Sequence, residues 1–152
     1  MVIYIFLLEN IEDNFKENIM NFIFDMVAGG LNFISGKTGF TYEEINIIVY
    51  YIIIPFTYVL LIDKYFKKHY LKIGFIILLV IFLISIKSFK EFSELLFEKS
   101  ANFLNSFNFL GLDYYYASVV ICVFVVILVY IILTALLIIK KRKEKILWNN
   151  IK

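Results

Sequence analysis

Uncharged, mostly apolar residues fill three windows of this chain. No formal charge occurs across residues 45–62, 73–86 or 114–139, which are 18, 14 and 26 residues long. A helix needs about 20 apolar residues, at a rise of about 1.5 Å each, to cross the roughly 30 Å hydrocarbon core of a bilayer. The pattern therefore predicts an integral membrane protein with three transmembrane helices, near residues 45–63, 71–88 and 115–139.

The second window is the shortest of the three. As a helix, 14 residues cover only about 21 Å, a length that is also typical of a re-entrant or buried segment. Lys72 and Lys87 flank the window, and their long side chains can reach the two interfaces while their neighbours stay in lipid. A span here also keeps the basic C-terminus on the same side as the basic loop before the window, so we expect three spans.

Outside the windows, apolar residues recur at spacings of three and four, the period of an amphipathic helix. The stripes are Leu8, Ile11, Phe15, Ile19, Phe22, Ile23 and Met26 within residues 1–35, and Phe89, Phe92, Leu96, Phe103 and Phe107 within residues 89–108. Neither stretch is basic enough to resemble a polybasic lipid sensor. The predicted fold is therefore all-α, a single membrane domain with three transmembrane helices and two amphipathic helices in the outer interface or packed on the spans.

Local signals mark where these helices begin. Thr41 followed by Glu44 forms a capping-box signature at the start of the first span, and Ser88 with Glu91 repeats it before the second amphipathic helix. Pro55 lies near the middle of the first span and lacks an amide donor. Because its neighbours stay apolar, we expect a kink there rather than a broken helix.

Composition supports a membrane location. The chain is 62% hydrophobic, whereas soluble domains are about 45–50% apolar. Abundant Phe, Ile, Lys and Asn are typical of an AT-rich genome and suggest a bacterial source. The single cysteine, Cys122, lies in the third window, so the chain forms no intramolecular disulfide.

Basic residues are distributed unequally between the two sides that the spans would separate. Residues 1–44 carry two basic and seven acidic side chains. The basic candidates for topology and lipid-headgroup contacts are Lys64, Lys67 and Lys68 in the first connector and Lys140, Lys141, Arg142 and Lys143 in the tail, residues 140–152. Lys and Arg near short loops stay cytoplasmic and interact with anionic lipid. We expect a multi-pass protein of the inner membrane, with its N-terminus outside and its C-terminus cytoplasmic.

Few residues offer catalytic or ligand chemistry. Residues 30–38 contain Gly-Lys-Thr, but five residues rather than four separate it from the first glycine, so a turn before the first span is expected instead of a phosphate-binding loop. His69 is the only histidine and stands among lysines, while Cys122 lies in an apolar window. A metal site or a nucleophile with its base needs more partners than these. We expect no enzymatic activity, no cofactor and no metal, and identify no nucleic-acid or small-molecule partner.

Polar residues inside the windows are the remaining candidates. Asn46, Tyr50 and Thr57 fall on one face of the first span, and in lipid such groups bond across helices more often than they line a pore. The expected partner is Ser118 or Thr134 of the third span, or the same face of another copy. The candidate association or pore residues are Asn46, Tyr50, Pro55, Thr57 and Ser118.

Two functional hypotheses follow from these features. The first is a non-enzymatic membrane protein that acts by helix–helix association, with itself or with other chains, as a subunit or accessory of a membrane complex. The alternative is a self-assembling pore-forming or membrane-permeabilising protein, such as a holin-like or anti-phage effector. No Asp, Glu, Lys, Arg or His lies in the three windows, which disfavours an ion pathway through one chain.

Overall fold

The computed structural model describes residues 2–110 and 113–151, and these residues form helices and no strand. This confirms the all-α class. The elements are α1 (Val2–Thr38), α2 (Tyr42–Ile47), η1 (Ile48–Ile53), α3 (Ile54–Phe66), α4 (Tyr70–Ser85), α5 (Phe89–Asn105), η2 (Ser106–Leu110), α6 (Tyr114–Val119), η3 (Val120–Val125) and α7 (Val126–Ile151). The segments η1 and η3 are π-helical and η2 is a 3₁₀ helix.

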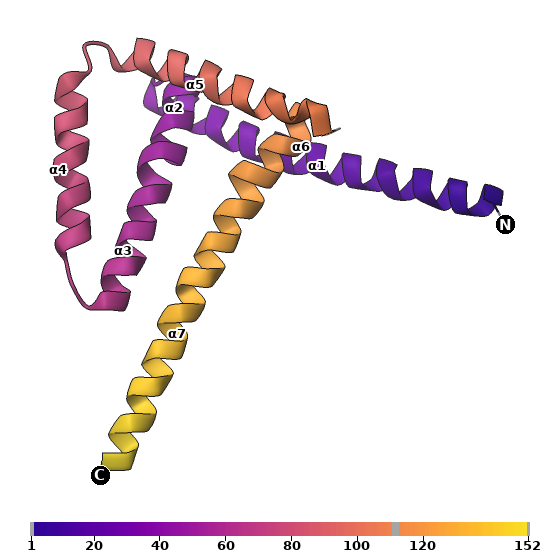
Figure 1. The fold of residues 1–152 in the computed structure, drawn as a ribbon. Helices are drawn as coiled ribbons and strands as arrows, with labels where there is room; N and C mark the ends of the chain where they lie inside the picture. The colour runs from indigo at the N-terminus through magenta and orange to yellow at the C-terminus, as the bar shows by residue number, and fades with distance from the viewer. Residues whose placement is uncertain (1, 111–112, 152) are drawn as a thin grey trace.

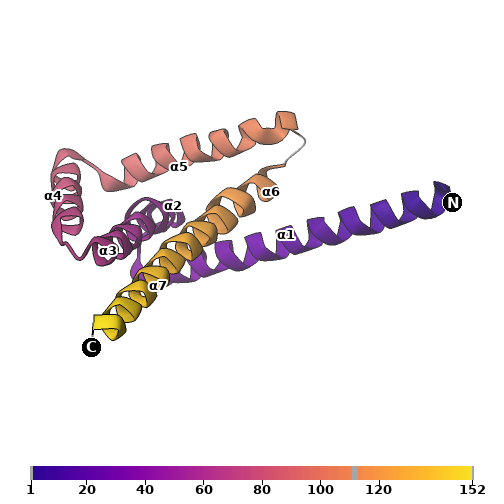
Figure 2. The same ribbon diagram turned by 60° about the horizontal axis from the view of Figure 1, so that its bottom comes forward.

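The helices form two groups (Figure 1). Helices α4, α3 and α7 stand in a row, with α4 and α7 both packed on α3. Helices α1 and α5 run across one end of this row, where α2 and α6 lie, and Figure 2 shows them on either side of those two short helices. The chain bends by 108° between α4 and α5. We call α1 and α5 the surface helices and the continuous stretches α2–η1–α3 and α6–η3–α7 the upright helices.

Helix α1 is longer than predicted. It continues through Thr38 and ends at Gly39, whose φ of 79° is a left-handed conformation that glycine adopts without steric cost. The turn expected before the first span therefore begins only at Gly39, because residues 30–38 continue the helix. The predicted stripe is exposed at Phe15, Phe22 and Met26. The buried positions Met20 and Leu31 belong to a second apolar face, which contacts the rest of the molecule.

Both upright helices contain a π turn at the same depth. The first begins at the predicted capping box: the Thr41 hydroxyl accepts from the Glu44 amide, and the Glu44 carboxylate accepts from the Thr41 amide at 2.7 Å. The helix then runs without a break past Pro55, which directly follows η1. Pro55 has no backbone N–H and therefore leaves one helical carbonyl without its usual donor. A π turn shifts the hydrogen-bond pattern and so helps the helix to tolerate this missing donor.

A buried aspartate joins α3 to α4. The Asp63 carboxylate accepts from the amides of Leu71 and Lys72 at 3.3 and 2.9 Å, in the first turn of α4. Lys67 ends α3 with a left-handed φ of 55°. Ser88 begins α5 by accepting from the Glu91 amide, which confirms one half of the second predicted capping box. The α3–α4 hairpin is thus closed by Asp63, which lies near the end of α3 and caps the start of α4.

Three helical stretches are long and apolar enough to cross a membrane: Asn14–Thr38, Tyr42–Phe66 and Tyr114–Leu147. The last two contain predicted spans. The first was predicted as an amphipathic surface helix, and it qualifies because residues 18–36 carry a single charge, Asp25. Helix α4, over the predicted span 71–88, has 16 residues and qualifies only together with α5 across the 108° bend.

The two upright helices are copies of one structural unit. Every boundary of α2, η1 and the start of α3 recurs 72 residues later in α6, η3 and the start of α7. The N-cap residues Thr41 and Asp113 also occupy equivalent positions. Each side chain accepts a hydrogen bond from a backbone amide in the first turn of its helix. Each upright helix follows a surface helix, so the chain contains two repeats, α1–α2–η1–α3 and α5–η2–α6–η3–α7, with α4 between them.

An approximate two-fold axis between α3 and α7 relates the repeats (Figure 1). Tyr58 and Tyr130 occupy equivalent positions in the two repeats and contact each other, with their ring centroids 4.8 Å apart and their planes tilted by 59°. Each surface helix packs on the upright helix of the other repeat: Phe24 of α1 contacts Tyr114, and Phe97 of α5 contacts Tyr42. We call this exchange the crossed packing.

The core follows the same symmetry. Among the described residues, the buried apolar side chains lie where the surface helices meet α2 and α6. Most of them occupy equivalent positions in the two repeats: Leu31 and Leu104, Ile45 and Ala117, and Ile47 and Val119. The lower parts of α3, α4 and α7 bury almost nothing in the single chain. Packing therefore fixes the molecule at the end that the surface helices cover.

Candidate functional site

A cavity of about 430 Å³ lies between the two repeats, at the end of the row covered by the surface helices. Its apolar wall is symmetric: α1 contributes Phe24, Ala28 and Leu31, and α5 contributes the counterparts Phe97, Ala101 and Leu104, each 73 residues later. Ligand pockets typically have volumes of 300–1,000 Å³ and apolar walls with a few polar groups. The size and the lining of this cavity are both in that range.

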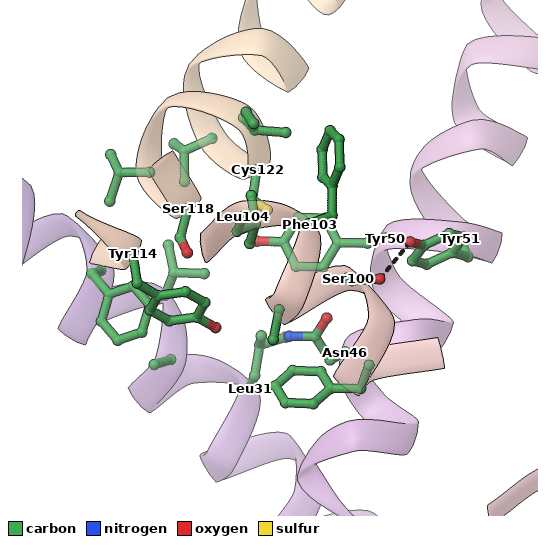
Figure 3. A pocket seen from close by; sticks show the side chains of 18 of the residues that line it. Leu31, Asn46, Tyr50, Tyr51, Ser100, Phe103, Leu104, Tyr114, Ser118 and Cys122 are labelled. Atoms are coloured by element: carbon green, nitrogen blue, oxygen red, sulfur yellow. Dashed lines mark hydrogen bonds between the residues drawn. The ribbon is translucent and has the colours of Figure 1, made fainter. Parts of the chain in front are cut away.

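Besides Tyr42, Tyr51 and Tyr114, four polar side chains from the upright helices line the cavity (Figure 3). Asn46 and Tyr50 come from α2 and η1, and their counterparts Ser118 and Cys122 come from α6 and η3. In each helix the two residues are four apart, so they share one face. Repeat equivalence thus brings together two predicted candidates, Asn46 and Tyr50, with a third, Ser118. We call these four residues the polar quartet.

Ser118 has an unusual environment for a helical serine. Only 7% of its surface is exposed, and its hydroxyl has no hydrogen-bond partner among the described residues. Hydroxyls inside a helix commonly donate to the carbonyl four residues earlier. Ser85, Ser100 and Thr134 do so here, at 2.7–2.8 Å. The Ser118 hydroxyl instead points into the cavity (Figure 3).

The π turns lie at the level of this cavity. Tyr50 lies within η1 and Cys122 within η3. π turns occur mostly as single turns in α-helices and frequently at functional sites. Here two of them face each other across the cavity, one from each repeat.

The cavity meets the outside between η1 and α5. Three of its lining residues there are exposed: Tyr51 at 48%, Phe103 at 58%, and Lys99. A hydrogen bond of 2.8 Å joins the Tyr51 and Ser100 hydroxyls across this edge. Lys99 is the only formally charged residue among the described lining residues, and it lies at this mouth, not inside.

Below the cavity the upright helices bind one another directly. Thr57 hydrogen-bonds the Tyr130 hydroxyl and also donates to the Ile54 carbonyl at 2.8 Å. The Tyr58 hydroxyl donates to the Val126 carbonyl at 3.1 Å. Thr57 therefore meets the third predicted span, as its position in the stripe suggested, but through Tyr130 rather than through Ser118 or Thr134.

The predicted basic residues gather at the opposite end of the molecule. Lys67 pairs with Glu144 at 2.9 Å, and Lys140 donates to the Tyr65 carbonyl and lies over the Tyr65 ring. These contacts join the α3–α4 loop to α7. The remaining members, Lys64, Lys68, Lys141, Arg142 and Lys143, are exposed.

Other candidates from the sequence have no such surroundings. Residues 30–38 lie inside α1, so they form no phosphate-binding loop. Within the part of the chain that the structure describes, no three His, Cys, Asp or Glu side chains gather as a metal site. His69, which precedes α4, is exposed.

Comparisons with protein-family models, with curated proteins and with solved structures found no match, so the site is interpreted from its own geometry.

The two-fold repeat is the main feature that the sequence interpretation missed. Only a few positions are identical at a separation of 72 residues, among them Tyr42 with Tyr114 and Tyr58 with Tyr130. The detectable signal was an N-cap residue followed by tyrosine, Thr41-Tyr42 and Asp113-Tyr114, each ahead of a long uncharged window. The apolar wall supplied by α1 and α5 carries no sequence signature of its own.

Proposed function

We propose that this protein is a multi-pass membrane protein in which α3, α4 and α7 cross the bilayer while α1 and α5 lie in the outer interface. The repeats support this topology. The upright helices run in the same direction, so the chain must return across the membrane between them, and α4 is the segment that returns. Parallel repeats about an axis along the membrane normal are a known transporter architecture. Helix α4 covers about 24 Å, and Lys72 and Lys87 extend its reach to both interfaces.

The charges set the orientation of this arrangement. The basic residues of the α3–α4 loop and of α7 lie together at the end away from the surface helices, as the Lys67–Glu144 pair and the Lys140–Tyr65 contact require. Basic residues beside short loops remain cytoplasmic. The surface helices α1 and α5 therefore lie outside.

We further propose that the protein acts by helix–helix association rather than by catalysis, as a subunit or accessory of a membrane complex. The observation that carries this proposal is an asymmetry between the repeats. Helix α4 covers one face of α3, where Phe56 stacks on Phe75. No helix among the described residues covers the equivalent face of α7, and Leu128 and Ile131 are 55% and 58% exposed there.

This open face is a continuous helical stripe. Its members are Ile127, Leu128, Ile131, Thr134 and Ala135, all exposed, and their counterparts on α3 are Pro55, Phe56, Val59, Ile62 and Asp63, none of them exposed. A second helix that packs on this stripe would complete the two-fold arrangement. Small residues such as Ala135 allow the close approach that holds helices together in lipid.

The topology is tested by cysteine labelling in a Cys122→Ser background. Single cysteines at Ser35, Lys68 and Lys99 are treated with a membrane-impermeant maleimide in intact and in permeabilised cells. We expect Ser35→Cys and Lys99→Cys to react in intact cells and Lys68→Cys only after permeabilisation. Labelling of positions 68 and 99 from the same side would show that α4 does not cross.

The association is tested by tryptophan substitution. The wild-type particle, extracted in mild detergent, should be larger than one chain plus its detergent. Ile131→Trp on the open face should reduce it to one chain, while Leu136→Trp, at an apolar residue that is also exposed (44% against 58%) but lies on another side of α7, should not. A wild-type particle of one chain, or no effect of Ile131→Trp, would refute the proposal. A closed ring with a water-filled lumen would instead favour the pore-forming hypothesis.

A further inference from the structure

The cavity between the repeats has the features of a ligand site that helix association does not require. It is large enough for a small molecule, its wall is apolar, and its polar groups converge from two helices. One of the residues that supply them, Ser118, is only 7% exposed, and its hydroxyl is not bonded to its own helix or to any described residue. A buried hydroxyl without a hydrogen-bond partner is unfavourable, and a ligand that bonds it removes that cost.

We propose that this cavity binds an uncharged lipid whose head carries hydroxyl or carbonyl oxygens. The polar quartet sets the chemistry of the head. Asn46, Tyr50 and Ser118 both donate and accept hydrogen bonds, Cys122 donates weakly, and none of the four is charged at neutral pH. A charged head would lose its hydration without a counter-charge, which is strongly unfavourable. A neutral oxygen-bearing head matches these groups.

The apolar wall sets the rest of the ligand. Phe24, Leu31, Phe97 and Leu104 enclose the polar quartet from the two surface helices. The mouth lies between η1 and α5, beside the exposed Phe103. In the proposed topology this mouth is at the outer interface, so a lipid can enter sideways with its apolar part in the bilayer and its head against the quartet. Lys99 remains at the edge, in reach of water.

Two sources supply such a head: acylglycerols, with hydroxyl and ester oxygens, and isoprenoid quinones, with ring carbonyls. Cys122 offers a reporter for both, because it is the only cysteine and lines the cavity. The protein is reconstituted in phosphatidylcholine nanodiscs, and the rate of Cys122 alkylation by N-ethylmaleimide is measured with monooleoylglycerol, with a short-chain ubiquinone, or with permanently anionic hexadecyl sulfate. We expect at least one neutral probe to slow alkylation about tenfold or more at saturation, and hexadecyl sulfate to leave the rate unchanged.

The Ser118→Ala variant separates recognition from structure. Because the hydroxyl bonds no described residue, its removal should leave the thermal stability of the ligand-free protein unchanged or raise it. The concentration of neutral lipid that halves the alkylation rate should increase about 3- to 10-fold, as expected for the loss of one hydrogen bond. Ser85→Ala, whose hydroxyl donates to Ile81 outside the cavity, is the matched control and should change neither quantity.

The two neutral probes distinguish the sources, since protection by only one of them identifies the lipid class. The proposal is overturned if neither neutral probe protects Cys122, if hexadecyl sulfate protects it equally well, or if Ser118→Ala binds the neutral probe as tightly as the wild type. None of these results depends on whether the protein associates through α7.

Discussion

The Asp63 cap should be essential to the α3–α4 hairpin. Asp63 is only 4% exposed, and its two carboxylate oxygens accept from the amides of Leu71 and Lys72 at 3.3 and 2.9 Å. These amides belong to the first turn of α4, which has no side-chain cap from its own N-cap residue, His69. Replacement of Asp63 by alanine leaves both amide donors without their protein acceptor.

The magnitude follows from the geometry. A hydrogen bond to a charged group contributes about 1.5–3 kcal/mol, but one of the two bonds is long, and loss of a cap costs about 0.5–2 kcal/mol in measured cases. We expect Asp63→Ala to lower the free energy of unfolding by about 2 kcal/mol. For a chain of this size that corresponds to a decrease in Tm of about 4–8 °C. Asp63→Asn keeps one acceptor oxygen and should lose about half as much.

The assay uses Cys122 as an internal reporter. A fluorogenic maleimide reacts faster when unfolding fully exposes this half-buried thiol, so Tm is read in a fixed detergent from the rise in labelling rate above that of the folded protein. Asp25→Ala, which removes an exposed carboxylate from α1, is the control and should shift Tm by less than about 1 °C. If Asp63→Ala shifts Tm no more than Asp25→Ala does, the cap does not hold the hairpin together and the reasoning is wrong.

Three further predictions use the same assay. Lys67→Gly should raise Tm by about 1–3 °C, because relief of the left-handed φ of 55° outweighs the loss of the exposed Lys67–Glu144 pair; a decrease would contradict this. Thr57→Val and Tyr130→Phe should each cost about 0.5–1.5 kcal/mol, and the double variant should cost little more than either, whereas additive losses would argue against their hydrogen bond. Thr41→Ala should cost about 1 kcal/mol by removing the capping box, and an unchanged Tm would show that the Glu44 contact alone suffices.

Local chemistry and apolar runs made much of the fold predictable. The charge-free windows predicted the upright helices, and the capping residues Thr41 and Ser88 marked helix starts correctly, because both signals depend only on nearby residues. The length of α1 was harder to predict from the sequence. A glycine and a threonine at its end are compatible with either a turn or a helix, and the position of the left-handed residue, Gly39, decided the outcome.

The cavity could be predicted only in part. The stripe of Asn46, Tyr50 and Thr57 pointed to a polar face toward another helix, because a helical period places these residues together. The partners could not be read from one helix alone, since they depend on how two helices 72 residues apart align. That alignment set Ser118 and Cys122 opposite the upper part of the stripe and Tyr130 opposite Thr57.

The crossed packing has a consequence for biosynthesis. Phe24 of α1 contacts Tyr114 of α6, 90 residues later in the chain. At a synthesis rate of about 5–20 residues per second, the α1 face that receives Tyr114 waits on the order of 5–20 s before its partner emerges. The α3–α4 hairpin, held by Asp63 within nine residues of sequence, can form long before that. In the proposed topology the hairpin therefore enters the membrane first, and α1 completes its contacts only when the second repeat arrives.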